Sequence, residues 1–188
     1  MTLTFAAFEQ LKRFVSFDHA DVANLRELAP HIARVGPTLT DRFYEVLGAE
    51  PATARIIEGR VDALKETHRQ WLLDLVAGDY GEDYFWSRVR IGQVHVVQDL
   101  TPAWVEAVMS LIRTQAIRAL ANEFPDTVEF ADSLASFIKI CDLDMLVINL
   151  AYADERLERL SGFTGMKRTL IENIIRIPPL TQPADKAC

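Results

Sequence analysis

The feature that most limits the fold of this chain is a helical pattern that runs from about residue 127 to about residue 160. Apolar residues recur along it at the spacing of a helix with buried faces, among them Phe137, Ile140, Ile148 and Leu157. Helices in globular proteins average about 10 to 14 residues, so a helix of this length needs partners along most of it. We therefore predict an all-α fold in which one side of this helix covers a core. Another side can meet a second chain, and the alternative is that all of these stripes pack within a monomer core.

Helical spacing also accounts for most of the remaining sequence. Pro30 is expected to mark a bend, and the polar residues from 181 onwards are expected to be disordered. The other predicted helices, separated by proline, glycine or aspartate, cover residues 5–17, 18–28, 37–47, 51–57, 61–75, 88–100, 103–123 and 166–177.

The composition limits the class of protein. The 188 residues suffice for one domain with a substantial core, and the hydrophobic content of 49% argues against disorder. A formal net charge of −7 disfavours a nucleic-acid partner. The two cysteines, Cys141 and Cys188, make neither a disulfide framework nor a paired metal motif, which is typical of a reducing compartment. Because the chain also lacks a signal peptide and a run of 18 uncharged apolar residues, we expect a cytoplasmic protein without a membrane partner.

One histidine stands out in residues 88–104, because it lies among apolar neighbours shortly before a proline break. Ile91, Val94 and His95 share one face of a helix. Gly92 leaves room where a flat ligand or another backbone comes close. On residue type alone two interpretations of His95 stay open: a hydrogen-bonded core histidine, which is the commoner case, and an iron ligand that faces a porphyrin.

Charged residues are expected away from such a site. Arg88 and Arg90 fall on positions that flank or oppose the His95 face, and the acidic residues scatter as they do on solvated helix surfaces. His19 and His31 lie among polar or helix-starting residues and are given no role. We find no nucleophile elbow and no Cys/His pair at metal spacing.

The sequence around His95 resembles a known family. The run Arg90-Ile91-Gly92-x-x-His95, followed by Leu100-x-Pro102-x-Trp104, is similar to the proximal-histidine segment of the globin-coupled sensor family. These are haem proteins related to protoglobins and sensor single-domain globins. The segments Leu64-Lys65-Glu66-Thr67, Ala77-Gly78 and Phe43-Tyr44 are similar to that family's distal helices. The resemblance extends from about residue 18 to about residue 160.

Two positions depart from the family pattern. Asp99 stands where members usually carry glycine, and Val105 stands where many carry tyrosine after the tryptophan. The second departure puts in question a tyrosine contact to the proximal imidazole.

The resemblance implies a globin-like helical sandwich that holds haem b. It assigns residues 1–17 to an extra N-terminal helix, 18–160 to the globin domain, and 161–188 to a C-terminal helical extension and a disordered tail. The two long C-terminal helices would form a homodimer interface. Family sensors usually continue into an output module, so we expect either a sensor domain cut from a longer protein or a free-standing globin of the same lineage.

The resemblance also assigns the site residues. His95 would be the proximal iron ligand, with its Nδ1–H donating to the carbonyl of Gly92 or Ile91. Tyr44 would donate a hydrogen bond to the bound gas, and either Thr67 or His68 would assist. His68 is also a candidate second iron ligand, and the opposing interpretation is that it points to water beside Arg69. The residues expected to hold the cofactor are His95, Tyr44, Phe43, Leu64, Thr67, His68, Ile91, Gly92 and Trp104.

Three functions stay open at this point. The first is a non-enzymatic haem-based sensor of O2, with CO and NO as further ligands, that relays its ligation state through a helical dimer interface. The second is a single-domain globin that turns over nitric oxide or peroxide, or that binds oxygen without signalling. The third is a cofactor-free helical dimerisation module.

Overall fold

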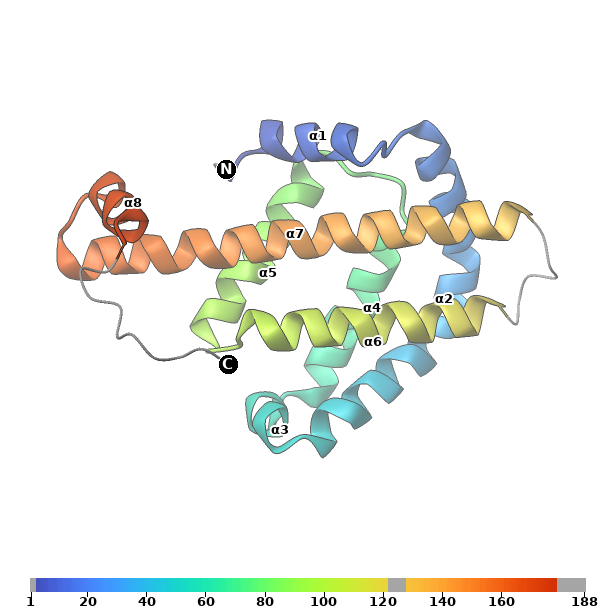
Figure 1. Cartoon of the computed structure of the whole chain (residues 1–188). Coiled ribbons are helices and arrows are strands. Elements are labelled where there is room, and N and C mark those ends of the chain that lie inside the picture. The colour runs from blue at the N-terminus through green and yellow to red at the C-terminus, as the bar shows by residue number, and fades with distance from the viewer. Residues whose placement is uncertain (1–2, 122–127, 179–188) are drawn as a thin grey trace, which may run out of the picture.

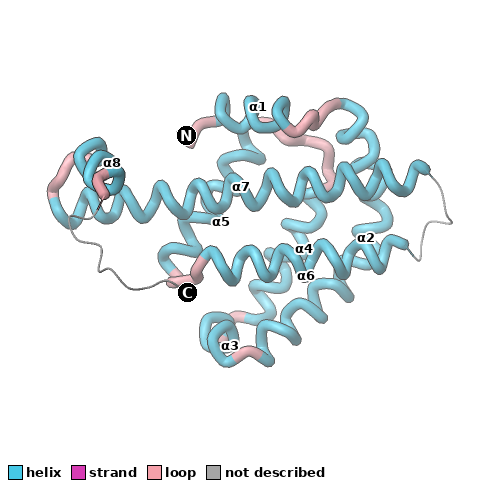
Figure 2. The backbone as a smooth tube through the Cα atoms, in the orientation of Figure 1, coloured by secondary structure: helices cyan, strands magenta, loops and turns pink. Residues whose placement is uncertain are grey.

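The computed structural model describes residues 3–121 and 128–178, and every regular element in these ranges is a helix (Figures 1 and 2). The predicted all-α class is therefore confirmed. In chain order the helices are α1 (Phe5–Phe14), α2 (His19–Ala49), α3 (Pro51–Ile57), α4 (Val61–Leu75), α5 (Glu82–Val97), α6 (Pro102–Ala121), α7 (Val128–Thr164) and α8 (Arg168–Arg176). Within the described ranges, none of these helices combines the length and the apolar character that crossing a bilayer requires.

Local sequence signals explain where several helices begin. Thr4 caps α1, since its hydroxyl accepts a hydrogen bond from the backbone N–H of Ala7 at 3.2 Å. Asp18 and Asp21 form a reciprocal capping box at the start of α2. α3 begins with Pro51, whose missing N–H costs nothing in the first turn of a helix.

The two helices predicted on either side of Pro30 are in fact one helix. α2 continues through Pro30 and Pro37, so the prediction of two separate helices is wrong. A proline inside a helix removes one backbone hydrogen bond and bends the axis, and Figure 1 shows α2 curving towards α3. The helix persists because one face stays buried along its whole length, at Leu25, Leu28, Ile32, Gly36, Leu39 and Phe43.

The long C-terminal helix predicted from the sequence is α7, which packs against α6 (Figure 1). It continues through Ser161 and Gly162, where the sequence predicts a weakening, and ends at Thr164. The predicted interruption between the two long helices and the predicted disordered tail lie outside the described residues.

α5 lies directly against α7, and Gly92 makes this close approach possible. A Cβ atom at Gly92 would lie 2.4 Å from the backbone oxygen of Ile148 and 2.7 Å from the Cβ atom of Ala151. The room that Gly92 leaves is therefore taken by the backbone of α7. This contact fixes where the helix that carries His95 sits relative to the longest helix of the molecule.

We predict that Gly92→Ala destabilises the fold by about 1 to 3 kcal/mol, because overpacking must push α5 and α7 apart. Urea unfolding measures this free energy. Gly48→Ala is the matched control, since a Cβ atom at Gly48, also in a helix, meets nothing within 4 Å. The control is expected to be neutral or to gain up to about 1 kcal/mol from helix propensity. Equal effects of the two substitutions would contradict the assigned role of Gly92.

Candidate functional site

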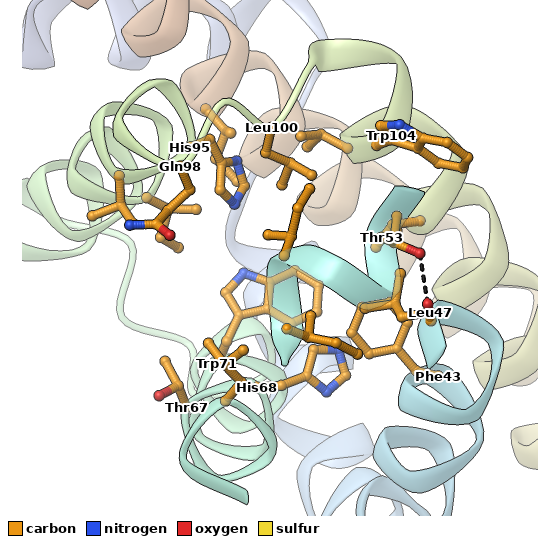
Figure 3. A pocket seen from close by; sticks show the side chains of 18 of the residues that line it. Phe43, Leu47, Thr53, Thr67, His68, Trp71, His95, Gln98, Leu100 and Trp104 are labelled. Atoms are coloured by element: carbon orange, nitrogen blue, oxygen red, sulfur yellow. Dashed lines mark hydrogen bonds between the residues drawn. The ribbon is translucent and has the colours of Figure 1, made fainter. Parts of the chain in front are cut away.

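An apolar cavity of about 450 Å³ lies between α2, α3, α4, α5 and α6 (Figure 3). This volume is typical of sites that hold a small molecule or a cofactor. Its wall is mostly aliphatic and aromatic, and includes Phe43, Leu47, Ile57, Leu64, Ile91, Val94, Leu100, Trp104, Val105, Val108, Met109 and Ile112.

The structure brings most of the predicted site residues together around this cavity. Every residue expected to hold the cofactor lines it except Gly92, whose open side faces α7 instead. Members of the set come from α2, α4, α5 and α6, which are distant in sequence. The tertiary structure brings these residues together, and no local sequence pattern predicts that they meet.

His95 projects from α5 into the cavity (Figure 3). Burial lowers the pKa of its imidazole to about 4, so the ring is neutral at neutral pH and keeps a lone pair for a metal. Its Nδ1 atom is buried without a hydrogen-bond partner among the described residues. The predicted hydrogen bond to the carbonyl of Gly92 or Ile91 is therefore not made, because the ring is turned into the cavity and away from its own helix.

His68 lies on α4 and also faces the cavity. Its Nδ1 atom is 2.9 Å from Thr40 Oγ1, and its ring stacks on Phe43 with a centroid distance of 4.6 Å. Burial, followed by the charge of Arg69, lowers the pKa of the imidazole to about 4. The interpretation in which His68 points to water is thus wrong, and its Nε2 atom is buried without a partner among the described residues.

The two predicted gas-binding hydroxyls differ in their surroundings. Tyr44 is buried, and burial raises its pKa to about 12. Its hydroxyl forms no hydrogen bond with the described residues, and the side chain lines the cavity. Thr67 is exposed at the cavity edge (Figure 3), and its hydroxyl donates to the carbonyl of Ala63 at 3.0 Å. Tyr44 is therefore the donor that is free to bind a ligand.

The charged residues that line the cavity among the described residues are Arg60 and Arg90, and no acidic side chain lies with them. Both arginines are exposed, so they mark the rim. Arg60 Nη2 donates a hydrogen bond to Gln98 Oε1 at 2.9 Å and links the start of α4 to the end of α5. A cationic rim in a chain whose formal net charge is −7 favours an anionic group at the mouth of the cavity.

Sequence reasoning missed several residues of this region. Arg90 lines the cavity although its helical position suggested a flank, and Trp71 lines it beside His68. Trp71 could have been predicted as a cavity residue, because residues three apart in a helix lie on the same face and His68 was already a candidate. Arg88, which the helical spacing placed on a flank or opposite face, forms a buried ion pair with Asp144 at 2.7 Å that the sequence did not predict. No group of three or more metal-ligating side chains occurs in residues 3–121 and 128–178.

Three comparisons with known proteins agree with this geometry. A profile of the family described as Protoglobin matches residues 5–158. The "Heme-based aerotactic transducer HemAT" of Halobacterium salinarum is 26% identical over 159 residues, which are 78% of this chain and 32% of that protein. The "globin domain of Geobacter sulfurreducens globin-coupled sensor" superposes with a TM-score of 0.72 at 28% identity, covering 77% of this chain and 96% of that one.

This chain spans about a third of the length of the aerotactic transducer. It spans nearly all of the solved globin domain, and the residues matched by the family profile, 5–158, include the helices that form the cavity. The resemblance seen in the sequence is confirmed: the chain belongs to the protoglobin family and has the globin fold found in globin-coupled sensors.

Proposed function

We propose that this protein binds haem b in the cavity, with His95 as the proximal iron ligand, and that it senses O2. The observation that carries the proposal is a buried imidazole, neutral at neutral pH, that projects from α5 into an apolar cavity. Haem supplies an iron that binds diatomic gases. Membership of the protoglobin family and similarity to a haem-based transducer support the same assignment.

The residues around the cavity suit each part of this cofactor. The aliphatic and aromatic wall matches the faces of a porphyrin ring. The guanidinium groups of Arg60 and Arg90 at the rim suit the two propionates, because arginine pairs well with carboxylates. His95 provides a nitrogen ligand from α5.

The first test of the proposal is haem binding itself. We expect the protein, after incubation with haemin, to show an intense Soret band, and we expect His95→Ala to lose most of it. His19→Ala is the matched control, because His19 is an exposed histidine at the start of α2 and lies outside the cavity. Titration with haemin, followed by absorbance, measures both variants. An undiminished band in His95→Ala would exclude His95 as the ligand.

Tyr44 is proposed to donate a hydrogen bond to the bound gas and thereby to favour O2 over CO. The side chain is buried in the cavity wall and its hydroxyl forms no hydrogen bond with the described residues, so it is free to donate to a ligand that gains negative charge on binding, as O2 does and CO does not. Thr67 is a weaker candidate, because its hydroxyl is already engaged by its own helix.

We predict that Tyr44→Phe accelerates O2 dissociation about tenfold, which is the effect of losing one hydrogen bond, and leaves CO affinity nearly unchanged. Thr67→Val, which removes the other hydroxyl with little change of shape, is expected to change O2 dissociation little. Stopped-flow measurement of O2 dissociation compares the variants. A larger effect from Thr67→Val than from Tyr44→Phe would reverse the assignment.

His68 is proposed to be a second iron ligand in the absence of gas. Its Nε2 atom is buried without a partner in the described ranges, while Thr40 holds Nδ1 on the opposite side of the ring. With its proton on Nδ1, directed at Thr40 Oγ1, the imidazole keeps its lone pair on Nε2 for a metal. Displacement of His68 by a gas would then move α4.

If His68 binds iron, the ferric protein will have a low-spin, six-coordinate spectrum that becomes high-spin in His68→Ala. Absorbance and electron paramagnetic resonance distinguish the two spin states. His19→Ala serves again as the control and is expected to stay low-spin. A spectrum that His68→Ala leaves unchanged would remove the second-ligand proposal without affecting His95.

The relay is proposed to pass through α6 and α7 to a second copy of the chain. α6 carries a stripe of small exposed residues at helical spacing, Ala103, Ala107, Ser110 and Thr114, and α7 exposes Ile138. Small side chains let two helices approach closely. A homodimer formed by these helices would link two haem sites and pass the signal on to an output module or a partner in the cytoplasm, without an enzymatic step in this domain.

A further inference from the structure

Asp144 lies on α7 and is completely buried, with 0% of its surface exposed. Its Oδ2 atom accepts a hydrogen bond from Trp71 Nε1 at 2.7 Å. Its Oδ1 atom accepts hydrogen bonds from the Tyr84 hydroxyl at 2.6 Å and from Arg88 Nε at 2.7 Å. Trp71 belongs to α4, and the other two donors belong to α5. One carboxylate therefore joins three helices.

On one side this carboxylate holds the side chain of Trp71, a residue of the cavity wall. Asp144 does not line the cavity, but Trp71 does, and Figure 3 shows the indole between His95 and His68. The indole and the His68 imidazole are 5.4 Å apart, centroid to centroid. Because the N–H group is the only hydrogen-bond donor of a tryptophan side chain, an acceptor at 2.7 Å fixes the rotation of the ring.

On the other side the same carboxylate holds the proximal helix. Arg88 is buried two helical turns before His95, and its guanidinium carbon lies 4.1 Å from the centre of the Tyr84 ring. Asp144 precedes Ile148 by one turn, and the backbone of Ile148 meets Gly92. The ion pair and the glycine contact together fix the register of α5 on α7.

We propose that Asp144 is a positioning residue for the ligand site, which holds the Trp71 indole beside His68 in a fixed position relative to the helix that carries His95. The proposal rests on the haem-binding function proposed above. Since Asp144 belongs to α7, a ligand that displaces the indole acts on α7 directly. An indole without the hydrogen bond to Asp144 would instead rotate when displaced, and α7 would not be moved.

The chemistry of the contacts explains why the residue is a carboxylate. Three donors converge on Asp144, and an ionised carboxylate has enough lone pairs to accept all of them. Arg88 compensates its charge inside the protein. An asparagine at this position would direct an NH2 group at one of the donors and would leave Arg88 without its buried partner.

The decisive variant is Trp71→Phe in the haem-loaded protein, because it removes the N–H donor and keeps an aromatic ring. We expect the rate constant of CO recombination after photolysis to change about tenfold, the equivalent of one hydrogen bond. Trp86→Phe is the matched control. Trp86 is 47% exposed and donates its N–H to Glu82, one turn earlier on its own helix, so this variant should recombine like wild type. Wild-type kinetics in Trp71→Phe would overturn the proposal.

A second variant separates positioning from general stabilisation. Asp144→Asn is expected to shift CO recombination in the same direction as Trp71→Phe, and the double variant should shift it no further, because both act through one contact. Additive shifts would overturn the proposal. Should Asp144→Asn fail to fold, as the loss of a buried charge partner allows, Trp71→Phe and its control still decide the question.

A measurement without haem distinguishes this proposal from the proposed function. In the haem-free protein, the Trp71 indole N–H should exchange with D2O at least about tenfold more slowly than the Trp86 N–H, as a buried and hydrogen-bonded group does. Two-dimensional NMR follows both signals, and Trp71→Phe assigns the first. Equally fast exchange would refute the contact with Asp144. Failure of the wild-type protein to take up haem would refute the proposed function, and the exchange rates would then decide the position of the indole alone.

Discussion

The arrangement of this protein depends on the close contact between α5 and α7. At Gly92 the two helices touch backbone to backbone, since a Cβ atom there would overlap the Ile148 oxygen. Helices with ordinary side chains at the contact lie about 8 to 10 Å apart. The absence of one side chain therefore determines how deeply α5 enters the molecule. His95, three residues later, owes its place in the cavity wall to this depth.

The cavity then follows from what surrounds α5. α4 lies across the cavity from it and contributes His68, and α2 contributes Phe43 and Tyr44. Burial lowers the pKa of both cavity histidines, so both imidazoles are neutral at neutral pH. An apolar interior, neutral nitrogen ligands and a cationic rim form one consistent environment for a flat, mostly apolar cofactor with anionic edges.

A buried ion pair stabilises the same contact at a cost. Arg88 and Asp144 are 2% and 0% exposed, and taking two charges out of water is offset only when their geometry and hydrogen bonds are good. Here the carboxylate accepts from three donors, and the guanidinium also lies over an aromatic ring. A hydrophobic pair would fill the space with less desolvation. The ion pair instead fixes the relative position of the helices, because hydrogen bonds are directional and apolar packing is not.

Local signals in the sequence predicted most of the helices and singled out His95. Capping residues, apolar spacing and the motif around His95 are local signals, so the start of α2, the extent of α4 and the family could be read from the order of residues. Three features depend on long-range packing: α2 continues through its two prolines, His68 faces inward, and Arg88 and Asp144 are buried. Each of these depends on a partner far away in the chain: the long buried face of α2, Thr40 beside His68, and α5 against α7. Local propensity cannot predict these features, because the contacts that stabilise them form only when distant segments pack together.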